Sequence, residues 1–295
     1  MAEGYFDNYR IFRDPIHGFI KVYDAERDII NTPAFQRLRR IKQLGLTCLV
    51  YHGAEHTRFA HSLGVMELAT RVFEITVSKD SRRDKVLRWK EEEIERNKVL
   101  LRLVALLHDI GHGPFSHPSE ELFPNGLDHE QYAAKIIAED TELCEIIKDL
   151  PERYDVNVTA ENIINFIIGK EPEPFLQQII SGPLDADKMD YLLRDSYYAG
   201  VDYGRFDLDR IINTLVVVEH PIIKGPALGI DIGGLFAAEA MVLARYYMFL
   251  QVYFHEIRRA YDFHLTDFLK ELLPGGKYPE KVEDFINYDD YFVFH

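Results

Sequence analysis

Apolar and polar positions follow a helical pattern along most of this 295-residue chain. The pattern is clear over residues 33–44, where an Asn31-Thr32-Pro33 start and the following Gly45 mark the expected ends of one helix. Apolar side chains recur there every three residues, so they share one face of the expected helix. That buried face consists of Phe35, Leu38, Ile41 and Leu44.

The same periodicity predicts helices along the rest of the chain. We expect them over residues 57–77, 97–108, from 128 onward, 142–150, 159–168, 175–180, 186–199 and about 236–273. The segment 97–108, NKVLLRLVALLH, is apolar almost all round and predicts a central, buried helix. Residues 79–98 are mostly charged, which indicates an exposed helical hairpin.

Two segments depart from the helical pattern. Residues 9–23 alternate apolar and polar positions on both sides of Pro15 and Gly18, which predicts a short hairpin or extended arm. Residues 214–232 are rich in β-branched side chains around Pro and Gly, which predicts a small hairpin packed on the helical body. We therefore expect a mainly α-helical fold with a small β arm or hairpin at its edge.

The composition narrows the class of protein. Acidic residues outnumber basic ones by 49 to 34, for a net charge of −15, which disfavours binding nucleic acid by broad electrostatic attraction. The two cysteines, Cys48 and Cys144, form no Cys-x-x-Cys motif, so we expect no disulfide framework and a cytoplasmic location. The N-terminus lacks the pattern of a secretory signal, and apolar runs such as residues 211–218 are too short to span a membrane.

Candidate chemistry concentrates where the central apolar helix is expected to end. The sequence LLHDIGHGPFSH, residues 106–117, places three histidines and an aspartate around a Gly-x-Gly-Pro breaker. Because His108 and Asp109 follow a helix that would otherwise bury them, leaving both unpaired would cost roughly several kcal/mol. A divalent ion bound at this helix end removes that cost, and a helix-terminal hydrogen bond is the plain alternative.

Two further residues suit the same ion. His61 lies in HTRFAHSLG, beside the apolar face of its expected helix, and Asp187 lies in LDADKMDYLLRDS at the start of another. Taken alone, His61 suits a core position and Asp187 a helix cap, with Asp185 as a rival for either role. With His108 and Asp109 they give two imidazoles and two carboxylates, a set that suits iron, manganese, zinc or magnesium.

These motifs resemble those of the HD-domain phosphohydrolases. The likeness rests on the histidine in TRFAHSLG, the doublet in LLHDIGHGPFSH and the aspartate in DADKMDYLLRD. DPIHGFI, TPAFQRLRRIKQLG and GAEHTRFAHSLGV are similar to the branch that includes the SAM-and-HD-domain deoxynucleoside triphosphate triphosphohydrolase. The resemblance implies a single HD-type domain over residues 1–295 with a core of about 50–200. The chain stops on DDYFVFH, and we expect the native chain to continue past His295.

The resemblance also implies roles for individual side chains. Four would bind the metal ion: His61, His108, Asp109 and Asp187. Four would line the phosphate path and transfer protons, with His129 protonating the leaving group: His112, His117, Glu120 and His129. Seven would contact the phosphates or sugar of the substrate: Arg58, Lys188, Arg245, Gln43, Tyr191, Asp195 and Tyr253. The plain alternatives are loop residues for His112 and His117 and an ordinary helix start for His129.

Two positions depart from the pattern of that branch. Phe249 stands where the branch has a histidine near the substrate, and Asn31 replaces an aspartate that reads guanine at an activator site. The remaining activator-pocket residues are similar: Arg10, Gln36, Arg39 and Arg205. These departures disfavour guanine-specific activation, while nucleotide binding at an oligomer interface stays compatible with the sequence. The basic cluster of Arg37, Arg39, Arg40 and Lys42 suits a solvated helix face equally well.

Together these features predict a metal-dependent nucleotide phosphohydrolase. In the favoured reaction, water attacks the α-phosphorus of a dNTP and releases deoxynucleoside and triphosphate. Two alternatives stay open: an HD-type phosphatase or phosphodiesterase acting on nucleoside monophosphates or signalling nucleotides, and a non-catalytic nucleotide-sensing module. The resemblance also implies a homo-oligomer with a nucleotide activator between subunits, and we expect no membrane or nucleic-acid partner.

Overall fold

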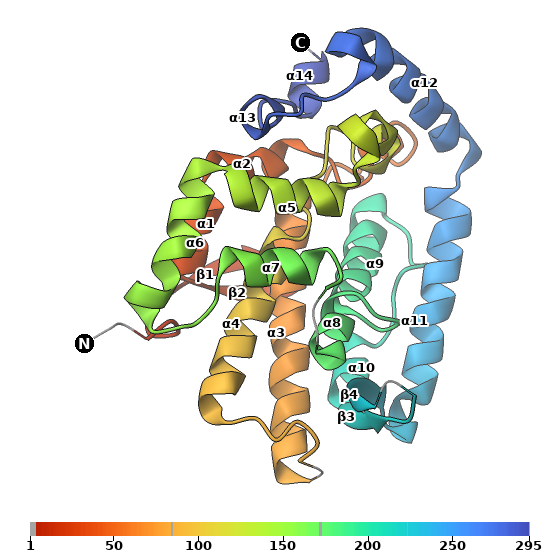
Figure 1. The fold of residues 1–295 in the computed structure, drawn as a ribbon. Helices are drawn as coiled ribbons and strands as arrows, with labels where there is room; N and C mark the ends of the chain where they lie inside the picture. The colour runs from red at the N-terminus through yellow and green to blue at the C-terminus, as the bar shows by residue number, and fades with distance from the viewer. Residues whose placement is uncertain (1–3, 84, 171–172, 223, 295) are drawn as a thin grey trace.

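The computed structural model describes residues 4–83, 85–170, 173–222 and 224–294, and its fold is mainly helical, as expected (Figure 1). Two antiparallel hairpins accompany the helices: β1 Tyr9–Asp14 with β2 Gly18–Tyr23, and β3 Leu215–His220 with β4 Gly225–Ile230. The α-helices of the described residues are α1 Asp24–Asn31, α2 Pro33–Gln36, α3 Arg58–Arg82, α4 Glu91–Leu107, α5 His129–Glu139, α6 Thr141–Tyr154, α7 Ala160–Ile167, α8 Pro174–Ile180, α9 Ala186–Ala199, α10 Leu208–Thr214, α11 Leu235–Met248, α12 Glu256–Leu272, α13 Val282–Phe285 and α14 Asp290–Phe294.

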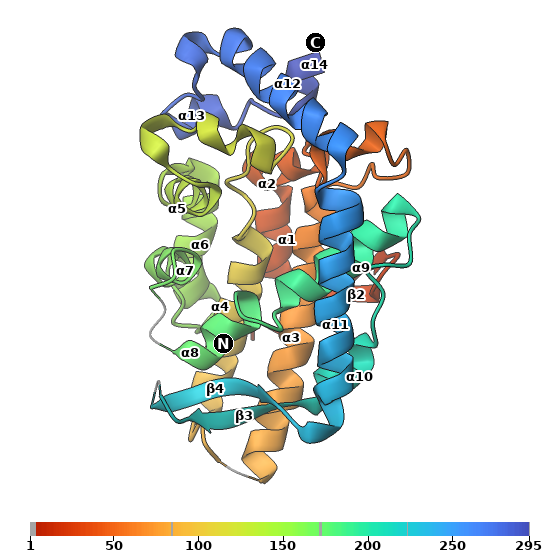
Figure 2. The same ribbon diagram turned by 90° about the vertical axis from the view of Figure 1, so that its right-hand side faces the viewer.

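Helices α3 and α4 run side by side through the centre of the molecule (Figures 1 and 2). The apolar sequence of α4 buries every residue from Val99 to Leu107, as predicted for a central helix. Burying each large aliphatic side chain contributes about 1.5–3 kcal/mol, so this helix is firmly held. Because α4 ends at Leu107, the packed core fixes where His108 and Asp109 project.

Arg102 is a charged residue inside this core, with 1% of its surface exposed. Its Nε and Nη2 donate to the two carboxylate oxygens of Glu26 at 2.6 and 2.8 Å. Its Nη1 donates to the Thr70 hydroxyl at 2.7 Å. A buried guanidinium without a carboxylate would be an uncompensated charge, so this pair ties α1 and α3 to α4.

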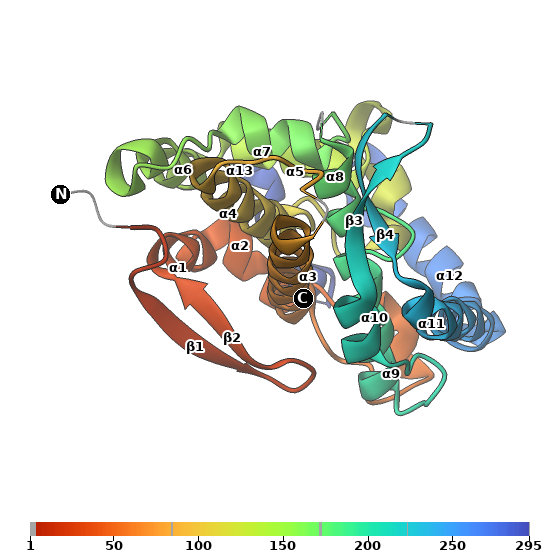
Figure 3. The ribbon, with the colours of Figure 1, turned by 90° about the horizontal axis from the view of Figure 1, so that it is seen from below.

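Both predicted hairpins are confirmed. In the first, pairing runs from Tyr9 opposite Tyr23 to Asp14 opposite Gly18. Gly18 has a φ of +76°, a conformation that glycine adopts without a Cβ penalty. Seen from below, this hairpin lies at one edge of the helical body (Figure 3). The second hairpin packs against α3 and α8.

The helix expected over residues 33–44 is wrong in length. Helix α2 ends at Gln36, a 3₁₀ turn covers Arg37–Arg40, and the predicted apolar face is nevertheless buried. Arg37 is fully buried and donates to the carbonyl oxygens of Tyr288, Ile110 and His112 at 3.0, 3.4 and 2.5 Å. The interpretation of the basic cluster as a solvated face therefore fails for Arg37, whose guanidinium satisfies backbone carbonyls of distant segments.

The single helix expected over about 236–273 is divided in two. Helix α11 ends at Met248, a π-helical turn covers Phe249–Tyr253, and α12 begins at Glu256. The wider turn closes with the Phe254 amide donating to the Phe249 carbonyl at 2.9 Å. As a result α12 leaves α11 at an angle and crosses the end of the molecule (Figure 2).

One helical stretch, Ile232–Tyr253, is long and apolar enough to cross a membrane by length and composition. This stretch is longer than the apolar runs from which no membrane span is expected. The most apolar window of this stretch is 22% buried inside the protein. A single helix of this kind is weak evidence for a membrane span.

Candidate metal and nucleotide site

Three elements bring the expected metal ligands together. His61 lies in the first turn of α3, His108 directly follows α4, and Asp187 lies in the first turn of α9. Their ligand atoms all lie within 4.8 Å of one another. The Asp187 Oδ1 is 3.0 Å from His61 Nε2 and 4.0 Å from His108 Nε2. Asp109 completes the group, with carboxylate oxygens 3.4 Å from His108 Nε2 and 3.6 Å from His61 Nε2.

The two imidazoles are oriented as metal ligands require. His108 Nδ1 lies 2.7 Å from the Ala105 carbonyl, so it carries the proton and leaves Nε2 unprotonated. That Nε2 is buried and has no hydrogen-bond partner among the described residues. His61 Nδ1 lies 2.7 Å from Asp190 Oδ2, and its Nε2 lies 3.0 Å from Asp187 Oδ1. Burial lowers the pKa of His61, but its hydrogen bonds to Asp187 and Asp190 raise it to about 10, so a bound ion would take the place of the Nε2 proton. Donating the other ring N–H to a carbonyl or carboxylate is typical of metal-binding histidines, so these residues fit a divalent ion.

Asp190 belongs to a buried ion network behind the ligands. Its Oδ1 lies 2.6 Å from His17 Nε2, and both of its oxygens accept from the Arg194 guanidinium at 2.8 and 2.9 Å. Arg194 Nη1 also donates to Asp14 Oδ2 at 2.9 Å. Burial alone would raise the pKa of Asp190, but Arg194 and the two imidazoles hold it well below its usual range. The first hairpin thereby supports the orientation of His61.

Asp109 has a cationic partner as well. Arg58 Nη1 donates to Asp109 Oδ2 at 2.5 Å, and Arg58 Nε donates to the Ser116 hydroxyl at 2.8 Å. Burial alone would raise the pKa of Asp109, but Arg58 and the adjacent imidazoles hold it well below its usual value. The carboxylate is therefore ionised, as metal binding requires.

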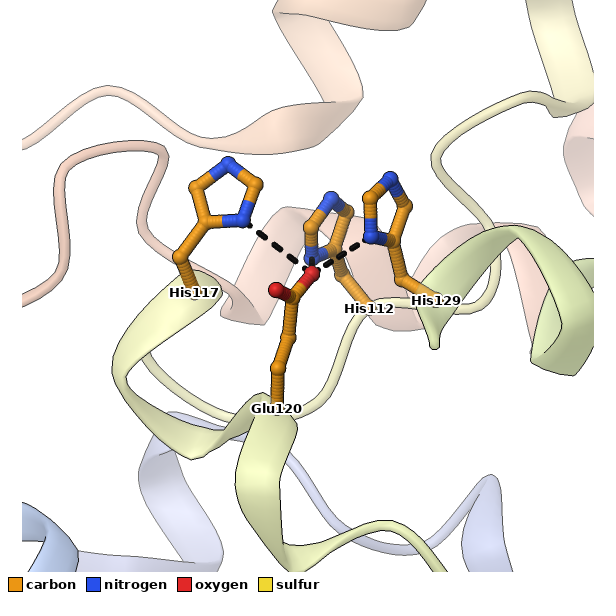
Figure 4. A group of neighbouring side chains, drawn as sticks. All are labelled: His112, His117, Glu120 and His129. Carbon is orange, nitrogen blue, oxygen red and sulfur yellow. Dashed lines mark hydrogen bonds and ion pairs between the residues drawn. The ribbon is translucent and has the colours of Figure 1, made fainter. Parts of the chain in front are cut away.

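A second polar group, the His112 cluster, consists of His112, His117, Glu120 and His129 (Figure 4). The Nδ1 atoms of all three imidazoles face Glu120 Oε1, at 3.8 Å for His112, 3.1 Å for His117 and 2.5 Å for His129. The rings of His112 and His129 stack with centroids 3.9 Å apart. Burial alone would lower the pKa of His129, but its hydrogen bond to Glu120 and the charge of Glu120 raise it.

The two groups face a common cavity of about 380 Å³, which is lined by the metal ligands together with His112, His117 and His129. A larger cavity of about 580 Å³ extends from it toward α12. Gln43, Arg58, His117 and Tyr191 line both cavities and therefore mark where they meet. Cavities of this size accommodate small-molecule ligands.

The expected sugar-facing residues line the larger cavity. Tyr253 donates to Asp195 Oδ2 at 2.7 Å, and His56 Nε2 lies 2.8 Å from Asp195 Oδ1. Arg245 Nε donates to the Tyr191 hydroxyl at 3.2 Å. The structure thus brings Gln43, Tyr191, Asp195 and Tyr253 to one place, with Phe249 beside them.

Two expected phosphate contacts have protein partners in this structure. Arg58 pairs with Asp109, and Lys188 Nζ lies 2.6 Å from Asp185 Oδ2. Asp185 also accepts from the Lys188 amide at 2.7 Å as the helix cap of α9. Of the two aspartates considered for the roles of helix cap and metal ligand, Asp185 caps α9 and Asp187 faces the two histidines.

The expected activator residues are spread over several elements. Gln36 and Arg39 lie together, with Arg39 Nε donating to Gln36 Oε1 at 2.9 Å and its guanidinium over the Phe59 ring at 3.5 Å. Arg10 is exposed on β1, and Arg205 is exposed between α9 and α10, where it pairs with Asp202 at 3.1 Å.

Several residues that support the site are not among those predicted from the sequence. His56 is buried, stacks on Tyr198 at 4.6 Å and holds Asp195. Asp190 and Arg194 are separated by four residues on one helix face, a spacing that suits an ion pair and could have marked them. Helix α12 contributes polar residues to the larger cavity although it lies far along the chain.

Comparisons with known proteins cover nearly the whole chain. The family model described as the HD domain matches residues 58–195, and the model described as the HD associated region matches residues 206–295. Among solved structures, a hypothetical protein from Aquifex aeolicus is 38% identical and superposes with a TM-score of 0.81. That match covers 97% of this chain and 71% of the other.

Two curated relatives illustrate the range of similarity. An uncharacterized protein from Bacillus subtilis, YwfO, is 41% identical over 261 residues, covering 88% of this chain and 55% of the relative. The deoxynucleoside triphosphate triphosphohydrolase SAMHD1 homolog of Dictyostelium discoideum is 33% identical over 296 residues, covering 95% of this chain and 53% of the relative. The chain spans about half the length of the curated relatives it matches.

Proposed function

The chain belongs to the HD-domain family, with an HD domain followed by an HD-associated region, and from that premise we propose that it is a metal-dependent nucleotide phosphohydrolase. One observation carries the proposal: two imidazoles, each with its Nδ1 bound to a protein acceptor, direct their Nε2 atoms toward two carboxylates. These four side chains line a cavity that continues into a second, larger one. His61, His108, Asp109 and Asp187 would hold the ion, which could be iron, manganese, zinc or magnesium.

The ion, when bound, supplies charge that polarises a phosphorus–oxygen bond and lowers the pKa of water. The chain's own groups would do the rest of the work. Arg58, Lys188 and Arg245 would hold phosphate oxygens, because guanidinium and ammonium groups match their charge. For Lys188 this requires exchange of its contact with Asp185 for a phosphate, since that contact occupies it in the free protein.

Proton transfer would fall to the His112 cluster. Glu120 raises the pKa of His129 and so favours its imidazolium form, which would protonate the departing 5′-oxygen. His112 and His117 would line the phosphate path beside it. Burial and the charge of Arg58 hold the pKa of His112 well below the ordinary value, so its imidazole is less readily protonated than that of His129 and less suited to act as general acid.

We propose a dNTP as the substrate and deoxynucleoside plus triphosphate as the products. The name of the Dictyostelium relative, a deoxynucleoside triphosphate triphosphohydrolase homolog, supports this choice. So does the larger cavity, where Gln43, Tyr191, Asp195 and Tyr253 line the wall beside the metal cavity. Incubation of the metal-loaded protein with a dNTP, followed by chromatography of the products, tests it. Release of monophosphate and pyrophosphate, or no cleavage at all, contradicts the proposal.

A second enzymatic candidate uses the same metal ligands on nucleoside monophosphates or signalling nucleotides. A substrate panel with nucleoside monophosphates and cyclic nucleotides separates it from the dNTP reaction. The third candidate is a non-catalytic nucleotide sensor. It predicts that His129→Ala leaves nucleotide binding intact and that the wild type has no turnover to lose. The enzyme proposal predicts that His129→Ala abolishes turnover and retains the metal ion.

Assembly and location belong to the proposal as well. We propose a cytoplasmic homo-oligomer, with a nucleotide activator bound near Gln36, Arg39, Arg10 and Arg205 at subunit contacts. The pairing of Gln36 with Arg39 supports a local polar surface there. Guanine specificity of the activator is disfavoured because Asn31 stands at the expected aspartate position.

A further inference from the structure

Two residues of α12 that line the larger cavity each have a buried polar atom without a protein partner. Asp262 and Arg258 line this cavity, and their side chains are only 5% and 11% exposed. Asp262 Oδ1 and Arg258 Nε make no hydrogen bond among the described residues. An unpaired buried polar group costs about 1–3 kcal/mol, so a ligand that supplies a donor and an acceptor would gain by binding here.

The remaining atoms of the two side chains are already fixed. Asp262 Oδ2 lies 3.2 Å from Arg259 Nη1 and 3.5 Å from Arg258 Nη2. Arg258 Nη1 donates to the Tyr253 carbonyl at the end of the π turn. The hydroxyl of Thr266, one turn further along α12, donates to the Pro118 carbonyl at 2.8 Å and anchors the helix beside His117. The free acceptor and donor are therefore held in place in advance of a ligand.

The cavity around them suits a flat aromatic ring. Phe249, Phe254 and Phe263 line it, and aromatic side chains stack on nucleobases with a contribution of about 1–3 kcal/mol per base. Asp195 and Tyr253 also line it, and so do the four residues shared with the metal cavity. A nucleotide with its phosphates at the metal ligands and its sugar at Asp195 would extend its base toward α12.

We infer that α12 recognises the base of the substrate, with Asp262 Oδ1 accepting a hydrogen bond from a base N–H and Arg258 Nε donating to a neighbouring base acceptor. This inference rests on the proposed function for the position of the phosphates. Each nucleobase carries N–H donors and ring or carbonyl acceptors on its edges, so any base can bind this pair. The affinity for each base depends on how well its donor and acceptor align with Asp262 Oδ1 and Arg258 Nε.

The Asp262→Asn substitution is the sharpest probe. Arg258 and Arg259 can only donate hydrogen bonds, so the oxygen of the new amide takes the place of Oδ2 beside them. The amide NH₂ then occupies the former place of Oδ1. An acceptor facing the base thereby becomes a donor at nearly unchanged size. Arg258→Lys is the second probe, because it keeps the positive charge and removes Nε. Glu271→Gln, an exposed position on the same helix, is the matched control.

Calorimetric titration of the four deoxynucleosides and of 1,2-dideoxyribose, which lacks a base, gives the first test. We expect the wild type to bind at least one deoxynucleoside more tightly than the sugar, and Asp262→Asn to reduce that difference about tenfold. Glu271→Gln should behave as the wild type. Equal affinities of the wild type for deoxynucleoside and sugar, or an unchanged difference in both α12 variants, would overturn the inference.

Turnover provides the second test and separates this inference from the proposed function. We expect the ratio of kcat/KM for a dNTP to that for 2-deoxyribose 5-triphosphate to fall about tenfold in Asp262→Asn, mainly through KM. A purely structural role for Asp262 predicts equal losses on both substrates and overturns the inference. If no triphosphate is cleaved but base-dependent binding is lost in the variants, the dNTP reaction fails and base recognition by α12 stands.

Discussion

In both His61 and His108, the ring Nδ1 lies within hydrogen-bond distance of a protein acceptor. The ring Nε2 faces the carboxylates of Asp109 and Asp187. The acceptor for His61 is Asp190, which is itself held by His17 and Arg194. A carboxylate in this position orients the ring and increases the basicity of the ligand nitrogen. The affinity of the site for metal therefore depends on a residue that does not touch the ion.

We predict that Asp190→Asn lowers the metal affinity by about 10–100-fold, because the amide provides a weaker acceptor for His61 Nδ1–H. Competition with a chromogenic chelator measures the affinity. Asp209→Asn, which alters an exposed pair with Arg71, is the control and should leave the affinity unchanged. Equal affinities in all three proteins would show that Asp190 is not a positioning residue for His61.

The pH dependence of turnover should reveal the link between Glu120 and His129. Glu120 raises the pKa of His129, so the imidazolium persists to higher pH than in a free histidine. A general acid is lost as the pH rises through its pKa. In Glu120→Gln the raised pKa falls, and we predict that the alkaline decline of kcat moves to lower pH.

The exposed Glu139→Gln on α5 serves as the control for that profile. Metal content should stay the same in both variants, because Glu120 is outside the ligand set. A decline at the same pH in Glu120→Gln and wild type would remove His129 from the proton-transfer step.

Among the elements, the contact between α3 and α9 sets the geometry of the site. These helices meet at Gly64, where an added Cβ would lie 1.9 Å from Asp190 Oδ1 and 2.5 Å from Arg194 Nη2. The ligands His61 and Asp187 lie on these same two helices. The absence of a side chain at Gly64 therefore allows α3 to pack closely against the Asp190–Arg194 ion pair of α9.

We predict that Gly64→Ala lowers the free energy of unfolding by about 1–3 kcal/mol, because the buried carboxylate and guanidinium must move. Metal affinity should fall with it. Urea denaturation and chelator competition measure the two effects. Gly225→Ala is the control, since its Cβ would meet nothing within 4 Å. Equal stability of Gly64→Ala and wild type would mean that α3 and α9 separate without cost.

Among the elements, the sequence predicts the helices and hairpins whose formation depends on residues close together in the chain. Helix α9 has the predicted bounds, and both hairpins follow their alternating and β-branched residues. The early end of α2 depends on distant partners, because Arg37 binds carbonyls of residues 110, 112 and 288. The break before α12 is instead closed by near neighbours, with the Phe254 amide donating to the Phe249 carbonyl and Arg258 donating to the Tyr253 carbonyl. No local periodicity encodes those contacts.

The same distinction applies to the site. The resemblance assigned His61, His108 and Asp187 to one ion, and the structure brings their ligand atoms together. The roles of His56, Asp190 and Arg194 emerge only when the helices pack, because each acts on a residue far away in the sequence.

At the scale of the whole molecule, α11 and α12 carry an unusual number of exposed apolar side chains. They include Phe236, Val242, Leu243, Tyr246, Ile257 and Phe263, and the turn between the two helices adds Leu250 and Phe254. Monomeric proteins rarely expose contiguous apolar patches larger than about a few hundred Å². These side chains support the proposed homo-oligomer, with α11 in a contact between copies.

We predict that Leu243→Asp reduces the molar mass measured by light scattering, because a buried unpaired carboxylate would oppose association. Ile222→Asp, at an exposed apolar position outside α11 and α12, should not change it. A wild-type mass equal to a single chain would contradict the homo-oligomer, and an unchanged Leu243→Asp mass would move the contact away from α11.

We propose that the chain hydrolyses a dNTP at its α-phosphorus with a site built on His61, His108, Asp109 and Asp187. The decisive measurement is turnover of a dNTP by the metal-loaded protein in ¹⁸O-water, followed by mass spectrometry of the products. We expect unlabelled deoxynucleoside and triphosphate carrying one ¹⁸O, with no reaction in Asp187→Ala. Label in a monophosphate or pyrophosphate, label in the deoxynucleoside, or equal turnover in Asp187→Ala would contradict it.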